Sequence, residues 1–228
     1  MQRYFLNSKC NYLSKEDSFH AVKVMRSNVD DKIITCFNGE CYLSKITIID
    51  QNKTEFHNIE KQPKKEILDI TLVQGLPKGS KTDEICKTAT TFGVNKIIFI
   101  SMVRSIAKLK NEQVKMARYN KIIKEASELS HRNSLPKLAF LNSVKALDFT
   151  GYDYILLCDE QEAKEKVNLK YIDKTKKICI IIGPEGGIDP KERNYFIEKN
   201  AKLISLGNYI LPTELAHLFV LPIIYALD

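Results

Sequence analysis

The sequence predicts an α/β protein with a mainly parallel sheet, preceded by a small β-rich domain. From residue 67 onward, β-branched apolar runs alternate with helical patterns, which is typical of a parallel sheet with helices on both faces. Before residue 61, short strand-like runs are separated by polar turns. The segment "KQPKKE" (61–66) is charged, contains proline and has no apolar period. It marks the predicted boundary between domains 1–65 and 66–228.

The first domain is expected to contain a β-hairpin. "KIITCF" (32–37) and "CYLSKITIID" (41–50) read as its strands, and Asn38-Gly39 lies between them. This pair suits a type I′ turn. "EFHNIEK" (55–61) is a third predicted strand. Short strands with polar turns indicate a small barrel.

The second domain is expected to alternate strands and helices, with Gly93 closing its first helix and Asp189-Pro190 opening a later one. Val114, Ala117, Ile122, Ala126 and Leu129 recur at helical spacing and predict one apolar helix face. The predicted elements are strand 67–75, helix 81–93, strand 96–101, helix 111–130, strands 152–159 and 176–183, a helix from 189, strand 201–207 and helix 213–227.

Composition favours a soluble cytoplasmic protein. The 228 residues are 44% hydrophobic and 28% charged, with a net charge of +7. This modest excess makes a nucleic-acid partner more plausible without establishing one. The N-terminus lacks the apolar core of a signal peptide, and no apolar run approaches the roughly 20 residues of a membrane span.

The cysteines and histidines show no metal-binding pattern. No CxxC pair or zinc spacing occurs among the six cysteines, and several lie in strand-like runs. We therefore expect them to be reduced and mostly buried. The four histidines form no ligand pattern, so no metal is predicted. The residues concerned are Cys10, Cys36, Cys41, Cys86, Cys158 and Cys179, with His20, His57, His131 and His217.

Two loops carry the candidate ligand site. "GPEGG" follows the strand-like "IIIG", and "LGNYILP" follows the strand 201–207. Ligands of parallel sheets bind at the carboxyl ends of strands, and glycines let a ligand approach the backbone closely. The glutamate among them argues against a phosphate and for a neutral or positively charged ligand.

A phosphate-binding P-loop is disfavoured at "VQGLPKGSKT" (73–82). Only three residues separate Gly75 from Gly79, and Ser80 stands where the second glycine of GxxxxGK is needed. No GxGxxG follows any strand, so a dinucleotide site is less favoured still.

Read in order, several segments resemble the RsmE family of small-subunit ribosomal RNA methyltransferases. The segments are "RYF", "HAVKVMR", "DDKIITCFNG", "LVQGLPKGSKTDEICKTATTFGV", "RSIAK", "EASELSHRNSLP", "IIIGPEGG" and "SLGNYILPTELA". The resemblance covers nearly the whole chain. It implies S-adenosylmethionine-dependent methylation of uridine N3 in small-subunit (16S) rRNA, favouring the assembled subunit as substrate. It also implies a homodimer, a SPOUT-type trefoil-knot domain and a PUA-like β-barrel.

The resemblance also implies the cofactor contacts. Glu185 has two readings, electrostatic help or loop shaping through backbone amides, and both stay open. The implied cofactor residues are Leu157, Ile182, Gly183, Pro184, Glu185, Gly186, Gly187, Leu206, Gly207, Ile210 and Leu211.

Methylation of N3 requires loss of its proton, so cationic or donor groups must favour the uridine anion. Arg104 and Arg132 are the candidates for gripping a phosphate or the base. Either could instead be an ion-paired surface arginine. Glu214 could orient the base or a loop amide, although a carboxylate is favoured in a first helical turn anyway.

The chain departs from the family pattern around the expected base site. Tyr209 and Pro212 stand where arginines are usual, Leu215 replaces a threonine, Thr91 a glutamate and Leu129 a glutamine. These changes leave two alternatives open: a non-catalytic rRNA-binding assembly factor that keeps the fold, and a SPOUT methyltransferase acting on another RNA position.

Overall fold

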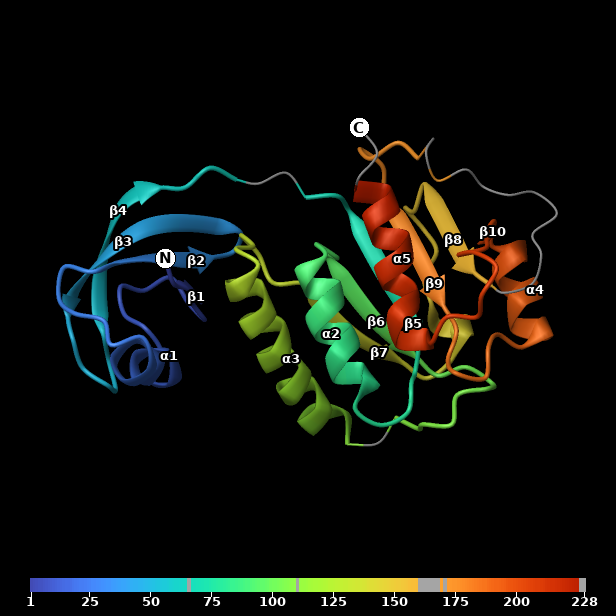
Figure 1. The fold of residues 1–228 in the computed structure, drawn as a ribbon, viewed down its shortest axis with the longest axis horizontal. Helices are drawn as coiled ribbons and strands as arrows, with labels where there is room; N and C mark the ends of the chain where they lie inside the picture. The colour runs from blue at the N-terminus through green and yellow to red at the C-terminus, as the bar shows by residue number, and fades with distance from the viewer. Residues whose placement is uncertain (65–66, 110, 160–168, 170–171, 226–228) are drawn as a thin grey trace. The chain divides into compact units, whose positions relative to one another are not determined.

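The computed structural model describes residues 1–64, 67–109, 111–159, 169 and 172–225 (Figure 1). Contacts divide the chain into two compact units. Unit 1 comprises Met1–Glu66 and Lys124–Leu135, and unit 2 comprises Ile67–Ile123 and Pro136–Asp228. The boundary expected between residues 65 and 66 lies outside the described residues. The grouping of Lys124–Leu135 with unit 1 had no signal in the sequence.

Unit 1 is built on a four-stranded sheet of order β1-β2-β3-β4. β1 pairs with β2 in parallel, and the other pairs are antiparallel. The predicted hairpin is confirmed, with Asn38 and Gly39 at φ 48° and 81°. A type I′ turn requires a positive φ at both central residues, and its twist matches that of the flanking strands. The elements are β1 (Arg3–Phe5), α1 (Lys15–Phe19), a π-helical turn (His20–Val24), β2 (Lys32–Phe37), β3 (Glu40–Ile48) and β4 (Glu55–Lys61).

The expectation that all cysteines are reduced was wrong for one pair. Cys36 and Cys41 form a disulfide across the hairpin. They are paired residues of β2 and β3, because the two-residue turn brings positions 36 and 41 opposite each other. Arg3 lies against both sulfurs, with Nη1 at 3.5 Å from Sγ of Cys36 and 3.4 Å from Sγ of Cys41. Hairpin register, rather than sequence spacing alone, was the signal for this bond.

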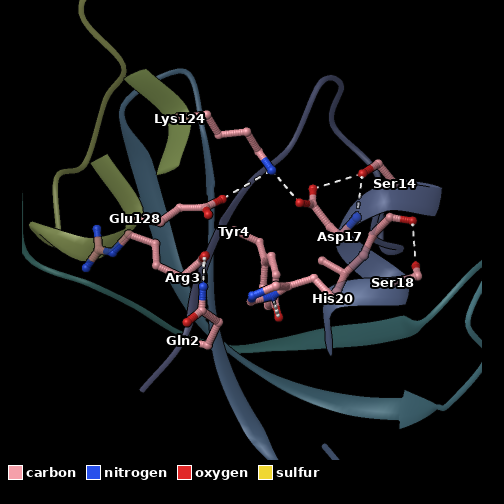
Figure 2. A network of polar contacts seen from close by, with 10 residues as sticks. Gln2, Arg3, Tyr4, Ser14, Asp17, Ser18, His20, Lys124 and Glu128 are labelled. Atoms are coloured by element: carbon pink, nitrogen blue, oxygen red, sulfur yellow. Dashed lines mark hydrogen bonds and ion pairs between the residues drawn. The ribbon is translucent and has the colours of Figure 1, made fainter. Parts of the chain in front are cut away.

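A buried polar network links α1 to helix α3 (Glu112–Leu129) within unit 1 (Figure 2). The Lys124 ammonium forms ion pairs with Asp17 and, at 3.2 Å, with Glu128. The Ser14 hydroxyl donates to Asp17 at 2.9 Å and accepts the N–H of Asp17 at 3.1 Å, which caps α1. This network of two carboxylates and one ammonium ties the end of α3 to the N-terminal segment.

The free energy of unfolding of unit 1 is expected to fall as the pH rises from about 5 to about 7. Burial raises the pKa of Glu128 to about 7, against the opposing attraction of Lys124. The folded state therefore holds a proton that the unfolded state has released, so unfolding free energy falls as pH rises through this window. Glu128→Gln should flatten that fall, as measured by urea denaturation at several pH values. An unchanged slope would contradict the assignment, and the exposed Glu60→Gln is the control.

Unit 2 holds a six-stranded sheet of order β10-β8-β9-β5-β6-β7. Every pair is parallel, which confirms the predicted α/β class. β7 was not predicted, although residues 138–141 form a short apolar run, and the strand is only half-buried. The strands are β5 (Ile70–Gly75), β6 (Lys96–Ile100), β7 (Lys137–Leu141), β8 (Tyr154–Cys158), β9 (Ile178–Ile182) and β10 (Lys202–Ile204).

Helices cover both faces of this sheet. One face packs against α2 (Lys81–Thr91), α5 (Thr213–Tyr225) and the first part of α3. The other packs against α4 (Pro190–Glu198). Successive residues of β5 alternate between the two cores, as Leu72 and Val73 do. Both faces are therefore apolar, which explains the nearly continuous hydrophobic strands.

The predicted apolar face of α3 was wrong at three of its five positions. Val114 and Leu129 are 72% and 75% exposed and Ala117 is exposed as well, whereas Tyr119, Ile123 and Ala126 are buried. Tyr119 is amphipathic and was missed by a count of aliphatic residues alone. Among the described residues, no helix has the length and apolar character needed to cross a membrane.

Candidate functional site

A cavity of about 360 Å³ lies in unit 2 at the carboxyl ends of β8, β9 and β10. Its walls come from the residues after β8, the Gly-Pro-Glu-Gly-Gly loop after β9 and the segment 205–213 that leads into α5. The lining residues are Lys81, Cys158, Asp159, Ile182, Gly183, Pro184, Glu185, Gly187, Ile188, Ser205, Leu206, Gly207, Asn208, Tyr209, Ile210, Leu211, Pro212, Thr213 and Ala216.

Most of the predicted cofactor residues line this one cavity. Two do not. Leu157 is fully buried in the core on the α4 face of the sheet, because its side chain alternates away from that of the lining residue Cys158. Gly186 faces Arg104, and a Cβ placed on it would lie 3.1 Å from the Arg104 Cβ. The nine that line the cavity are Ile182, Gly183, Pro184, Glu185, Gly187, Leu206, Gly207, Ile210 and Leu211.

The glycines of this region permit close backbone approach. A Cβ on Gly75, the last residue of β5, would lie 2.5 Å from the Pro184 nitrogen and 2.8 Å from the Gly183 carbonyl carbon. A Cβ on Gly183 would lie 2.7 Å from Ile188. Gly187 has φ 71° and donates its N–H to the Pro184 carbonyl at 2.9 Å, which closes a turn. The loop therefore folds tightly against the end of β5.

The buried side chain of Gln74 holds the cavity walls together. Its Nε2 donates to the carbonyls of Gly75 at 3.1 Å and Gly183 at 3.2 Å, and to the Thr213 hydroxyl at 2.7 Å. The Thr213 hydroxyl donates in turn to the Gly183 carbonyl at 2.5 Å. One amide thus joins β5, the loop after β9 and the first turn of α5.

Lys81 joins the two carboxylates that the sequence singled out here. Its ammonium lies 3.3 Å from Glu185 and 3.0 Å from Glu214. Partial burial favours the neutral acid at Glu185, but the Lys78 N–H and the Lys81 ammonium outweigh it, so the Glu185 pKa is lowered. The hydrogen bond to Glu214 raises the pKa of Lys81. At neutral pH the three groups carry a net charge of −1.

Glu185 also shapes its loop. Its Oε1 accepts the Lys78 N–H at 2.9 Å, which ties the loop after β9 to the loop before α2. In a P-loop this backbone N–H would face a phosphate. Here a carboxylate of the chain itself accepts it, so the segment 73–82 does not present a phosphate nest.

Arg104 contacts the Gly-Pro-Glu-Gly-Gly loop from outside the cavity wall. This exposed side chain donates from Nη1 to the Gly186 carbonyl at 3.1 Å. The segment that carries it is fixed by the Val103 N–H, which donates to Glu192 of α4 at 2.9 Å. Burial raises the pKa of Glu192. Among the described residues, only the Gly186 carbonyl accepts a hydrogen bond from the Arg104 guanidinium, which leaves its other nitrogens available for an incoming anion.

Arg132 belongs to unit 1 and is 6% exposed. Its Nε donates to the Ser134 carbonyl at 3.2 Å, and its own carbonyl accepts from Arg3 Nη1 at 2.5 Å. These contacts stabilise the turn after α3. The predicted contact of Arg132 with a phosphate or base stays a prediction.

Sequence reasoning missed several cavity residues. Asp159 follows β8, lines the cavity and forms a two-point ion pair with Arg193 of α4, at 2.5 Å and 3.1 Å. Its position as the last residue of the predicted strand 152–159 was the available signal, because ligands of parallel sheets bind at the carboxyl ends of strands. Lys81 lines the cavity, and Gln74 holds its walls without lining it. Both lie in the segment read as a strand followed by a helix and tested as a P-loop, and neither side chain was assigned a role.

Comparison with known proteins gives this cavity a family context. The model of the RNA methyltransferase domain matches residues 63–225. Ribosomal RNA small subunit methyltransferase E of Bacillus subtilis is 29% identical, over 97% of this chain and 94% of that protein. Ribosomal RNA small subunit methyltransferase E 2 of Borreliella burgdorferi is 28% identical, over 100% and 98%.

Solved structures share the fold over the whole chain. The Neisseria gonorrhoeae ribosomal RNA small subunit methyltransferase E, bound to S-adenosyl methionine, superposes with a TM-score of 0.83 at 21% identity, covering 99% of this chain and 96% of that one. The Legionella pneumophila putative methyltransferase Lpg2936, in complex with the same cofactor, gives 0.85 at 20% identity, covering 99% and 97%. With the domain match spanning the sheet, both glycine loops and α5, this chain belongs to the RNA methyltransferase domain family.

Proposed function

We propose that this protein methylates N3 of a specific uridine in small-subunit ribosomal RNA, using S-adenosylmethionine. The observation that carries the proposal is the convergence of nine of the eleven expected cofactor residues on one cavity at the carboxyl end of the sheet. Membership of the RNA methyltransferase domain family and the names of the full-length relatives support it.

The donor set of the cavity fits this cofactor. Residues of the loops 182–187 and 206–211 line it, and the backbone N–H and carbonyl groups of such loops suit the edge of an adenine. Glu185 lines the cavity, and Glu214 contacts Lys81 without lining it, so these carboxylates leave one formal negative charge beyond Lys81, which suits a sulfonium cation. When bound, the cofactor supplies an electrophilic methyl group.

The chain's own residues then have three tasks. The two loops bind and orient the cofactor, since correct positioning supplies a large share of the rate of such transfers. Arg104 stabilises the negative charge that develops on the base after loss of the N3 proton. The N3 proton would pass to water before the transfer. The bond from N3 to the methyl carbon would then form as the bond from sulfur to that carbon breaks, and a neutral thioether would leave.

The wider architecture of the family completes the proposal. The segment 205–213 and α5 form part of a SPOUT trefoil knot, and unit 1 is a PUA-like RNA-binding barrel. The protein acts in the cytoplasm as a homodimer on the assembled small subunit. Phe219 and Ile223, half-exposed on the outer side of α5, supply apolar surface for the dimer contact.

The test is mass spectrometry of small-subunit rRNA from cells with and without this gene. We expect one N3-methyluridine to disappear without the gene and to return when purified protein and S-adenosylmethionine are added to the unmethylated subunits. Arg104→Ala should restore it at least about tenfold more slowly, a larger loss than any in cofactor affinity by calorimetry, because Arg104 also contacts the Gly186 carbonyl of the cofactor loop. An intact methyluridine in the deletion strain would overturn the proposal.

The non-catalytic alternative has no comparable support. It was favoured by the absence of two family arginines at Tyr209 and Pro212. The relatives matched over nearly their full lengths carry methyltransferase names, and the cavity keeps its glycine walls.

A further inference from the structure

Tyr209 is the most exposed of the large hydrophobic side chains in the described residues, at 88%, yet it lines the cavity. No hydrogen bond, ring contact or cation contact holds its side chain in the part of the chain that the structure describes. Ile210 beside it is 79% exposed. An aromatic ring and an aliphatic side chain therefore stand together in water at the mouth of the cavity.

The loop that carries Tyr209 is held at both ends. The Ser205 hydroxyl donates to the Gly207 carbonyl at 3.1 Å. On the other side the Pro212 carbonyl accepts the N–H of Leu215 at 2.9 Å and starts α5. Pro212 also fixes its own φ. The ring is thus presented by a loop with one local hydrogen bond before it and the start of α5 after it.

We propose that Tyr209 is the stacking surface for the target base, which lies on the ring after it leaves its RNA stack. The inference rests on the proposed function. A base that undergoes chemistry must be swung out of its neighbours, and unstacked RNA bases are commonly held on aromatic side chains. Stacking needs a flat face and no charge, so the tyrosine contributes positioning while Arg104 contributes the positive charge.

The inference separates two tasks in this chain. Tyr209 acts on binding and orientation of the base, and the loops around Gly183 and Gly207 act on the cofactor. A second copy of the chain is the competing occupant of this apolar rim. The two occupants predict different effects when Tyr209 is replaced by alanine. If the base occupies the rim, affinity for RNA falls; if a second copy occupies it, the dimer is destabilised.

The first test is kinetic and uses small subunits from cells lacking the gene. Tyr209→Ala should raise KM for the subunits by about tenfold, a larger change than any in the calorimetric affinity for S-adenosylmethionine, while the sedimentation mass stays unchanged. Tyr209→Phe should stay within about twofold of the wild type. Equal KM values for the alanine variant and the wild type, or dissociation of the alanine variant into monomers, would overturn the inference.

The second test uses the absence of tryptophan from the chain. Tyr209→Trp, produced with 5-hydroxytryptophan, places a single probe on the rim that can be excited apart from the tryptophans of ribosomal proteins. Stacking predicts strong quenching when unmethylated subunits bind. Phe92→Trp is the matched control, because Phe92 follows α2 and precedes β6. It therefore lies at the amino ends of the strands, whereas the cavity lies at their carboxyl ends.

Quenching at position 209 alone supports the inference, and equal responses at both positions contradict it. Failure of the proposed function has a different signature. In that case the wild type itself transfers no methyl group to the subunits, whatever the probe reports.

Discussion

Replacing Gly75 by alanine is expected to weaken S-adenosylmethionine binding by at least about tenfold, the largest effect of any single methyl group that we predict. The added Cβ would lie 2.5 Å from the Pro184 nitrogen and 2.6 Å from its Cδ. Real Cβ atoms do not approach so closely, and the atoms in the way belong to backbone and a proline ring. The loop after β9 must therefore move away from the end of β5.

The energetic scale follows from the packing of this region. Forcing one extra methyl group into a close-packed site costs about 1–3 kcal/mol, and about 1.4 kcal/mol changes an equilibrium constant tenfold. Pro184 lines the cavity, so its displacement reaches the cofactor directly. We expect a lower midpoint of urea unfolding together with the weaker binding, which isothermal titration calorimetry would measure.

Gly151→Ala is the matched control. Gly151 has φ 79°, a conformation that disfavours alanine, but a Cβ there would meet no atom within 4 Å. It lies before β8, at the end of that strand remote from the cavity. This variant should lose stability without losing cofactor affinity. If both variants bound the cofactor as the wild type does, the packing of β5 against the loop would have no role in binding.

Sequence patterns predicted the architecture of unit 2 because its strands are buried on both faces. Long runs such as "IIIG" at the end of β9 admit few other readings, and caps such as Asp189-Pro190 fixed the start of α4. β7 was missed although residues 138–141 are apolar, because the run is short and the strand lies at the edge of the sheet, where its side chains are only half-buried. The strand order was not predictable, since it depends on pairings between segments far apart in the chain.

The site was partly predictable for a similar reason. The glycine loops were predictable from their composition and from their position directly after predicted strands. The contacts that hold them did not, because Gln74, Lys81 and Asp159 act on partners that are distant in sequence. The Cys36–Cys41 bond was likewise visible only in the register of the hairpin. Local sequence patterns therefore predict which loops form such a site. The side-chain contacts that hold those loops together join residues distant in sequence and are seen only in the structure.

Among those contacts, the Gln74 amide has the largest predicted effect. Gln74→Met keeps the volume of the side chain but removes the hydrogen bonds to Gly75, Gly183 and Thr213. A buried polar group left without its partner costs about 1–3 kcal/mol. We therefore expect Gln74→Met to lower the free energy of unfolding by about that amount and to weaken cofactor binding by about tenfold.

The linkage between folding and binding sharpens this test. A ligand that binds only the folded state stabilises it by RT ln(1 + [L]/Kd). Urea unfolding with and without S-adenosylmethionine therefore measures both effects in one experiment. The stabilisation at a fixed cofactor concentration should be smaller for Gln74→Met than for the wild type, because the Gly183 carbonyl has lost one of its two donors.

Thr71→Val separates a general loss of buried hydrogen bonding from a loss at the cavity. Thr71 lies near the start of the same strand, and its hydroxyl accepts from Tyr152 at 3.1 Å. This variant should lower stability while the cofactor-induced increment stays at the wild-type value. Equal increments for Gln74→Met and the wild type would remove Gln74 from the binding site and leave it a structural role only. A reduced increment for Gln74→Met alone means that the join between β5, the loop after β9 and α5 sets the shape in which the cofactor is bound.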